Sequence, residues 1–289
     1  MRGALLVGVS VFSMSVFSFC ILCSSGLFQI WFFLELLGLS LIPLFFLCPQ
    51  VNILQSLFSY LVASFLASCF ILAGVLSDFY VYSCLLGLLL KFGVFPFYFW
   101  VYGVVRHSNW CVVWSLSTYL KIPIFVIYYL FGSGVVMGWV EWTAFLGLIV
   151  LSFLFWFCSY DLYSCWCHMM LSSTVVMVVV SFASLELLCY LFAFYLVWAT
   201  LVLMTIWCCD KVGLLTSYYA FLVCGSVMAF PLSLGIFYKL LSSYCLFSFT
   251  FPPFIAWILY SISEQLYFLN LLVNYDLLRS DPSLLLGDV

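Results

Sequence analysis

The chain has 289 residues, of which 68% are apolar and only 6% are charged, whereas soluble domains carry about a quarter charged residues. This composition excludes a fold with a water-facing surface, and the length allows at most about eleven membrane helices of roughly 20 residues each. The net charge of −3 says little because the charges are so few, but the absence of a basic patch argues against nucleic acid as a partner. We therefore expect an all-α, polytopic transmembrane helix bundle surrounded by membrane lipid.

Ten apolar segments follow one another along the chain, separated by short polar or Gly/Pro stretches, and each predicts a membrane helix. They cover residues 4–23, 27–47, 53–76, 80–103, 110–131, 135–158, 163–182, 186–207, 213–249 and 252–275. The ninth is too long for one span, and Pro231 in its middle predicts a broken helix. We expect one transmembrane domain over residues 1–275 and a short polar C-terminal tail over residues 276–289.

Fourteen cysteines raise the question of a metal site or disulfides. The closest spacings are Cys20 with Cys23, Cys165 with Cys167, and Cys208 with Cys209. No second CxxC or paired histidine completes a four-ligand site, so we interpret cysteine as a small apolar residue here. The chain also lacks a dinucleotide-binding glycine turn and cluster-spaced cysteines. We therefore expect it to bind no metal and no cofactor of its own.

The loop charges predict the orientation in the membrane. With ten spans, both termini and the even-numbered loops share one side, which carries Arg2, Arg106, Lys211 and Arg279. The opposite side carries only acidic residues, namely Asp78, Glu141 and Glu186. Under the positive-inside rule, the side with both termini faces the cytoplasm or the mitochondrial matrix.

We single out four charged residues in the interior of apolar segments, where burial is costly. They are Glu35 in the second segment, Lys91 in the fourth, Lys121 in the fifth and Lys239 in the ninth. Each costs about 2.5–3.5 kcal/mol on membrane-insertion scales, and such residues normally face a protein interior or a wet cavity and mark an ion path. The alternative for a single lysine is a side chain that reaches to the membrane interface. We interpret the four together as a proton path.

A proline accompanies each of these charges, and we predict a helix break at each one: Pro43, Pro96, Pro123 and Pro231. A membrane proline frees a backbone carbonyl, and broken helices beside a charge form hydrated sites in transporters. Lysine suits proton transfer because desolvation disfavours its charged form while a nearby carboxylate favours it. Movement of Glu35 toward or away from Lys91 would then switch Lys91 between holding and releasing a proton.

Weaker candidates lie together on the seventh segment, namely His168, Ser172 and Ser173. They can line a proton path, but a single histidine in a membrane bundle is at least as often a hydrogen-bond partner between helices.

These landmarks resemble the subunit 2 family of mitochondrial NADH:ubiquinone oxidoreductase (respiratory complex I), whose members are antiporter-like membrane subunits. The most specific stretch is LKFGVFPFYFW at residues 90–100, which is similar to the family's K-x-G-x-x-P-F-H-F-W motif with Tyr98 in place of histidine. Further similarities lie at residues 31–43 (the family's glutamate helix), 119–122 (W-x-K-x), 171–173 (Y-S-S) and 230–239 (G-L-P-P-x-x-G-F-x-x-K). The resemblance implies that Glu35, Lys91, Lys121 and Lys239 form the family's proton relay.

The resemblance also implies a function, a location and partners. The chain would translocate protons across the mitochondrial inner membrane as a multi-pass subunit of an H⁺-translocating NADH:ubiquinone reductase, with both termini in the matrix. NADH, FMN, iron–sulfur clusters and ubiquinone would be bound by other subunits, and the partners would be other membrane-arm subunits and lipid, not a homo-oligomer. Two alternatives stay open: a stand-alone cation/proton antiporter of related fold, and a structural membrane subunit without an ion path.

The sequence departs from the family at positions that are often basic: Ser59, Trp166, Cys167 and Asn270. In addition, the chain ends soon after the tenth segment, where many relatives have a further helix. These departures put a role for those four positions in doubt and leave the four central charges in place.

Overall fold

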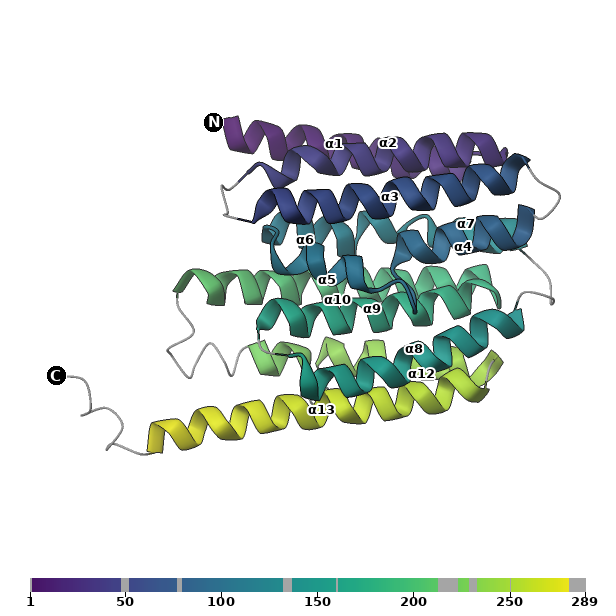
Figure 1. Cartoon of the computed structure of the whole chain (residues 1–289). Helices are drawn as coiled ribbons and strands as arrows, with labels where there is room; N and C mark the ends of the chain where they lie inside the picture. The colour runs from purple at the N-terminus through teal and green to yellow at the C-terminus, as the bar shows by residue number, and fades with distance from the viewer. Residues whose placement is uncertain are drawn as a thin grey trace.

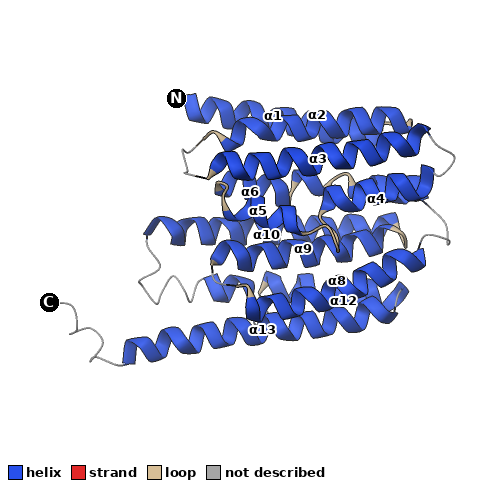
Figure 2. Cartoon of the chain, in the orientation of Figure 1, coloured by secondary structure: helices blue, strands red, loops and turns tan. Residues whose placement is uncertain are grey.

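A computed structural model of the chain describes residues 2–47, 52–76, 80–131, 137–159, 161–212, 223–228, 233–249 and 251–280. Within these ranges every regular element is a helix (Figure 2). The prediction of an all-α bundle is therefore confirmed. Residues 281–289 of the polar tail expected at 276–289, and the helix break predicted at Pro231, lie outside the described residues.

The helices follow the predicted segments in chain order (Figure 1). The first five segments contain α1 (Arg2–Cys23), α2 (Leu27–Phe45), α3 (Ile53–Leu76), α4 (Tyr80–Phe92) with α5 (Phe99–Arg106), and α6 (Trp110–Ser117) with the 3₁₀ helix η1 (Tyr119–Lys121) and α7 (Ile124–Phe131). The remaining segments contain α8 (Met137–Phe157), α9 (Leu162–Ser181), α10 (Leu185–Val212), α12 (Leu234–Phe249) and α13 (Phe251–Ser280). The last helix thus continues past residue 275, the expected end of the tenth segment.

Seven helical stretches among the described residues are long and apolar enough to cross a membrane, and two further apolar helices, Val81–Phe92 and Leu234–Ser248, are shorter. The surface presents many large apolar side chains, such as Phe12, Phe65 and Trp139. In water such a surface would be a liability, whereas in a bilayer the lipid tails cover it. The chain is therefore a multi-pass membrane protein.

Two of the predicted segments are interrupted near a proline. Pro96 lies in the turn between α4 and α5, where Gly93 has a φ of 66°, a left-handed conformation that glycine adopts without strain. Pro123 lies between η1 and α7. Pro43, in contrast, lies within α2, which continues past it to Phe45. Pro43 lacks the N–H that would bond the carbonyl of Leu39, and α2 ends two residues after it.

The helices are stacked side by side from α1 and α2 at one side of the bundle to α13 at the other, with α9 and α10 between them (Figure 1). Helix α9 is the central element: it contacts α5, α7, α8, α10 and α12, and almost its whole length is buried. The start of α1 and the ends of α10 and α13 lie at the same end of the bundle (Figure 1). Side chains on α9 therefore meet residues from both halves of the chain.

Small residues allow the tightest contact, between α3 and α4. A Cβ atom on Gly87 of α4 would lie 2.8 Å from the carbonyl oxygen of Ala67 and 2.7 Å from a side-chain carbon of Ile71, both on α3. Small residues at such crossings let membrane helices approach closely, where van der Waals packing drives their association. This contact fixes the position of α4, which carries Lys91.

Candidate functional site

The first buried charge pair joins α2 and α4. Lys91 Nζ lies 2.8 Å from Glu35 Oε1 and 3.3 Å from the carbonyl oxygen of Leu34. The Lys91 side chain is only 6% exposed, whereas that of Glu35 is 27% exposed. Since α4 ends at Phe92, Lys91 lies in the last turn of the helix, where a cation is favoured by the helix dipole. The lysine of this pair is therefore buried, whereas its carboxylate partner is partly exposed.

The second site surrounds Lys121, whose residue is 3% exposed. Its ammonium donates to the carbonyl oxygen of Met170 at 2.9 Å, to Ser173 Oγ at 2.7 Å and to Tyr195 Oη at 2.8 Å. These acceptors come from α9 and α10, and they use all three ammonium donors. No carboxylate in the described ranges forms an ion pair with Lys121. The site holds a lysine among neutral acceptors.

The third site joins α12 and α13. Lys239 Nζ lies 3.0 Å from Glu264 Oε1, and the two side chains are 11% and 3% exposed. The approach is not aligned as a hydrogen bond, so the contact is an ion pair. Sequence reasoning missed Glu264, although it is the single charged residue between positions 251 and 275 and was visible as such. The site therefore contains a second lysine–carboxylate pair.

The three weaker candidates on α9 have separate partners. Nδ1 of His168 is hydrogen-bonded to the Tyr102 hydroxyl of α5, and the imidazole ring packs 4.8 Å from that of Phe155. Ser172 donates to the carbonyl oxygen of Met169 in its own helix. Of the three, Ser173 contacts a predicted relay residue, because its hydroxyl oxygen accepts a hydrogen bond from Lys121. This last contact links α9 directly to the lysine on η1.

The four positions that depart from the family pattern make local contacts. Trp166 is fully buried and donates to Ser117 Oγ at 3.0 Å, and Cys167 is fully buried as well. Ser59 donates to the backbone of its own helix, and Asn270 is exposed on α13. Trp166 and Cys167 therefore face the interior of the bundle, where neither carries a charge.

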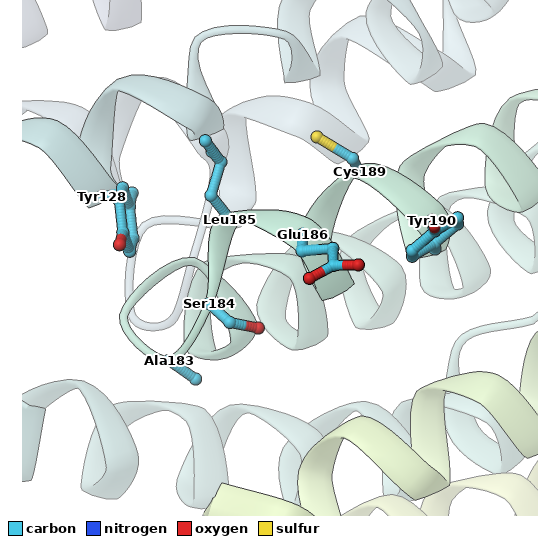
Figure 3. Close-up of a pocket in the computed structure, with 7 residues that line it drawn as sticks. All are labelled: Tyr128, Ala183, Ser184, Leu185, Glu186, Cys189 and Tyr190. Atoms are coloured by element: carbon cyan, nitrogen blue, oxygen red, sulfur yellow. The ribbon is translucent and has the colours of Figure 1, made fainter.

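Outside these sites, the described part of the chain offers little that can hold a ligand. It contains no group of three His, Cys, Asp or Glu residues close enough to hold a metal ion, and the cysteines whose side chains it describes are free. An open pocket of about 640 Å³ lies where α9 leads into α10, and its lining includes Tyr128, Glu186 and Cys189 (Figure 3). None of the predicted relay residues lines this pocket.

The buried charges occupy three successive parts of the bundle. Helices α2 and α4 carry the first pair, η1 with α9 and α10 form the Lys121 site, and α12 with α13 carry the second pair (Figure 1). Contacts of α9 and α10 with α12 connect the second site to the third, and a contact of α4 with α7 connects the first pair to the helix that follows η1. Such an arrangement can hold protons at three separated points within the membrane.

The comparisons with known proteins agree with a membrane bundle of this kind. No family model matches the chain. A solved structure, that of the Mrp complex from Dietzia sp. DQ12-45-1b, contains a chain that superposes with a TM-score of 0.72 at 16% identity, covering 90% of this chain and 58% of that one. The two chains share a fold, so this protein belongs to the class of multi-pass helical membrane proteins with that architecture.

A curated protein is similar in sequence over a shorter stretch. It is NADH-ubiquinone oxidoreductase chain 2 of Artemia franciscana, which is 29% identical over 107 residues, or 37% of this chain. The aligned part spans about a third of that relative's length, 35%. This relative is a chain 2 of the same enzyme whose subunit 2 family the motifs around Lys91 and Lys239 resemble.

Proposed function

We propose that the chain is an antiporter-like proton-translocating membrane subunit of an NADH:ubiquinone oxidoreductase. The observation that carries this proposal is the burial of three lysines, each at a separate point of the bundle and each with specific partners. The similarity to an NADH-ubiquinone oxidoreductase chain 2 and the fold shared with a chain of a multi-subunit membrane complex support it.

In this proposal the buried charges act by electrostatic gating without covalent chemistry. Glu35 stabilises the ammonium of Lys91 at 2.8 Å, and withdrawal of the carboxylate would favour release of the proton. Lys121 would take up a proton between neutral acceptors, and Lys239 would pass it on beyond α12. Redox chemistry with NADH, FMN, iron–sulfur clusters and ubiquinone would take place in other subunits, whose conformational changes move Glu35.

The proposal includes the membrane topology. The helices make ten crossings when interrupted segments are counted as single spans. One such span is α4 with α5, another is α6 with η1 and α7, and a third is the segment that ends in α12. Both termini would then lie on the side that carries Arg2, Arg106, Lys211 and Arg279, the mitochondrial matrix. The partners would be neighbouring membrane-arm subunits and the lipid of the inner membrane.

A second candidate function is a stand-alone cation/proton antiporter of related fold, and the fold shared with a chain of the Mrp complex fits both candidates. Native gel electrophoresis of mildly solubilised membranes separates the two. A complex I subunit migrates in a large assembly that oxidises NADH, whereas a stand-alone antiporter migrates in a smaller particle without that activity.

The proton-translocation proposal is tested with the assembled complex in proteoliposomes. Lys91→Ala and Lys239→Ala should each lower proton uptake per NADH oxidised in the fraction of the complex that still assembles. Arg106→Gln is the matched control, because the Arg106 side chain is 60% exposed and lies outside the three sites. Full proton uptake by an assembled complex with both lysines replaced would refute the proposal.

A further inference from the structure

The Lys239–Glu264 pair is an unusual feature for a bundle held together by apolar contacts. Both side chains are nearly excluded from solvent, at 11% and 3% exposure, and Ala256, Trp257 and Phe268 on the carboxylate's helix are buried beside it. Replacing a buried ion pair with apolar residues of similar volume is often neutral or stabilising. The stability of the α12–α13 contact therefore gives no reason for the pair.

Two buried tyrosine hydroxyls lie within electrostatic reach of Glu264. Tyr238, the residue before Lys239, and Tyr260, one helical turn before Glu264, are 2% and 0% exposed. Within the described residues neither hydroxyl forms a well-aligned hydrogen bond, although Ser173 lies near that of Tyr238, and Ser172 and Glu264 lie near that of Tyr260. A buried polar group without a partner is costly, and such groups commonly bind internal water. The two hydroxyls and the charge pair thus define a polar site between α12 and α13.

This polar site extends toward Lys121. The ring of Tyr238 lies 5.7 Å from that of Tyr195, whose hydroxyl accepts a hydrogen bond from Lys121. The hydroxyl of Tyr238 also lies near Ser173, the other side chain that binds Lys121. The contacts of Tyr238 therefore link the α12–α13 site to the Lys121 site.

The contacts between helices show which of the two charged groups lies nearer to Lys121. Helix α12, which carries Lys239, contacts α9 and α10, the helices that hold Lys121. Helix α13, which carries Glu264, contacts α12 and α8 and is the outermost helix in Figure 1. Lys239 is thus on the side of the pair that faces Lys121, and Glu264 is on the far side.

We propose that Glu264 is a proton-carrying residue, which takes the proton of Lys239 and releases it on the far side of α12. In this step an N–H bond of the Lys239 ammonium breaks and an O–H bond forms on Glu264, which leaves both groups neutral. The lysine regains a proton through water held by Tyr238 and Tyr260, and the carboxyl group loses its proton to water. This inference rests on the proposed function and adds a relay member that the sequence reasoning did not include.

The competing explanation is a purely structural ion pair, and three variants of the assembled complex distinguish the two. Glu264→Gln keeps the size of the side chain but cannot exchange a proton, Glu264→Asp keeps the carboxylate, and the double variant K239L/E264L removes both charges. Glu186→Gln is the matched control, because this carboxylate is exposed at the first turn of α10 and lies outside the relay. Each is measured as proton uptake per NADH oxidised in proteoliposomes.

We expect Glu264→Gln and K239L/E264L to lose most of the proton uptake, and Glu264→Asp to retain it at a reduced level. Difference infrared spectra of the working complex should contain a band from a protonated carboxyl group that is missing in Glu264→Gln. Wild-type uptake in Glu264→Gln, or in K239L/E264L, would overturn the inference. If Lys91→Ala and Lys239→Ala also pump normally, the proposed function fails. If they do not, only the role of Glu264 fails.

Discussion

Replacing Lys91 or Lys239 with leucine removes the cation from two ion pairs that differ in burial, so the two replacements should differ in their cost to stability. In the first case the carboxylate left behind, Glu35, has a side chain that is 27% exposed and can regain some solvation. In the second case Glu264 is 3% exposed and stays buried without a partner. The structure therefore predicts that Lys239→Leu destabilises the chain more than Lys91→Leu.

The magnitudes follow from the surroundings of each carboxylate. Loss of a hydrogen bond to a charged, partly exposed group costs about 1.5–3 kcal/mol. Breaking a buried pair by removing one partner costs about 3–5 kcal/mol. With roughly 2–4 °C per kcal/mol for large domains, central costs of about 2 and about 4 kcal/mol lower the unfolding midpoint by about 4–8 °C for Lys91→Leu and by about 8–16 °C for Lys239→Leu.

The assay is thermal unfolding of the purified full-length chain in detergent, followed by the fluorescence of its 11 tryptophans. The double variant K239L/E264L supplies the control, since removing both charges should bring the midpoint back close to that of the unsubstituted chain. A midpoint for Lys91→Leu as low as that for Lys239→Leu would refute the burial argument. The burial argument would also be refuted if K239L/E264L were no more stable than Lys239→Leu.

Three further predictions follow from individual contacts. Tyr195→Phe removes one of three hydrogen-bond acceptors of the Lys121 ammonium, so it should lower the free energy of unfolding by about 1.5–3 kcal/mol in the same assay. It should also reduce proton uptake by the complex. Unchanged values of both quantities would contradict the role of Tyr195 in binding Lys121. Gly87→Val should separate α3 from α4 and cost about 1–3 kcal/mol, measured by the same unfolding midpoint, because its Cβ would lie 2.8 Å from a backbone oxygen. Asp161→Asn should change stability by less than about 1 kcal/mol, since its contact with Arg106 is 3.9 Å long and exposed; a larger loss would show that this pair is more than a surface contact.

The sequence predicted the helical segments well because apolar runs of membrane length are a local property that needs no knowledge of packing. The interruptions at residues 93–98 and 118–123 were marked only by Pro96 and Pro123, and the sequence did not predict how long they are. A proline does not always break a helix: α2 continues through Pro43 and ends two residues later, at Phe45.

The side-chain partners were harder to predict than the helices. The Glu35–Lys91 contact was expected from the family resemblance, and the structure has these atoms 2.8 Å apart. Tyr195 and Glu264 were not expected, because their role depends on which faces of α10 and α13 turn toward η1 and α12. That orientation is set by contacts between helices far apart in the sequence, which no local pattern encodes. A lone carboxylate in an apolar segment was nevertheless a visible reason to consider Glu264.

The most direct test of a proton path through this chain is the number of protons translocated per NADH oxidised when Lys121 is replaced by methionine. Lys121 is the lysine held by three neutral acceptors, so its removal leaves no unpaired carboxylate that would disturb assembly. The proposed function predicts an assembled complex that still transfers electrons but translocates fewer protons per NADH. An assembled Lys121→Met complex with an unchanged proton-to-electron ratio would contradict it.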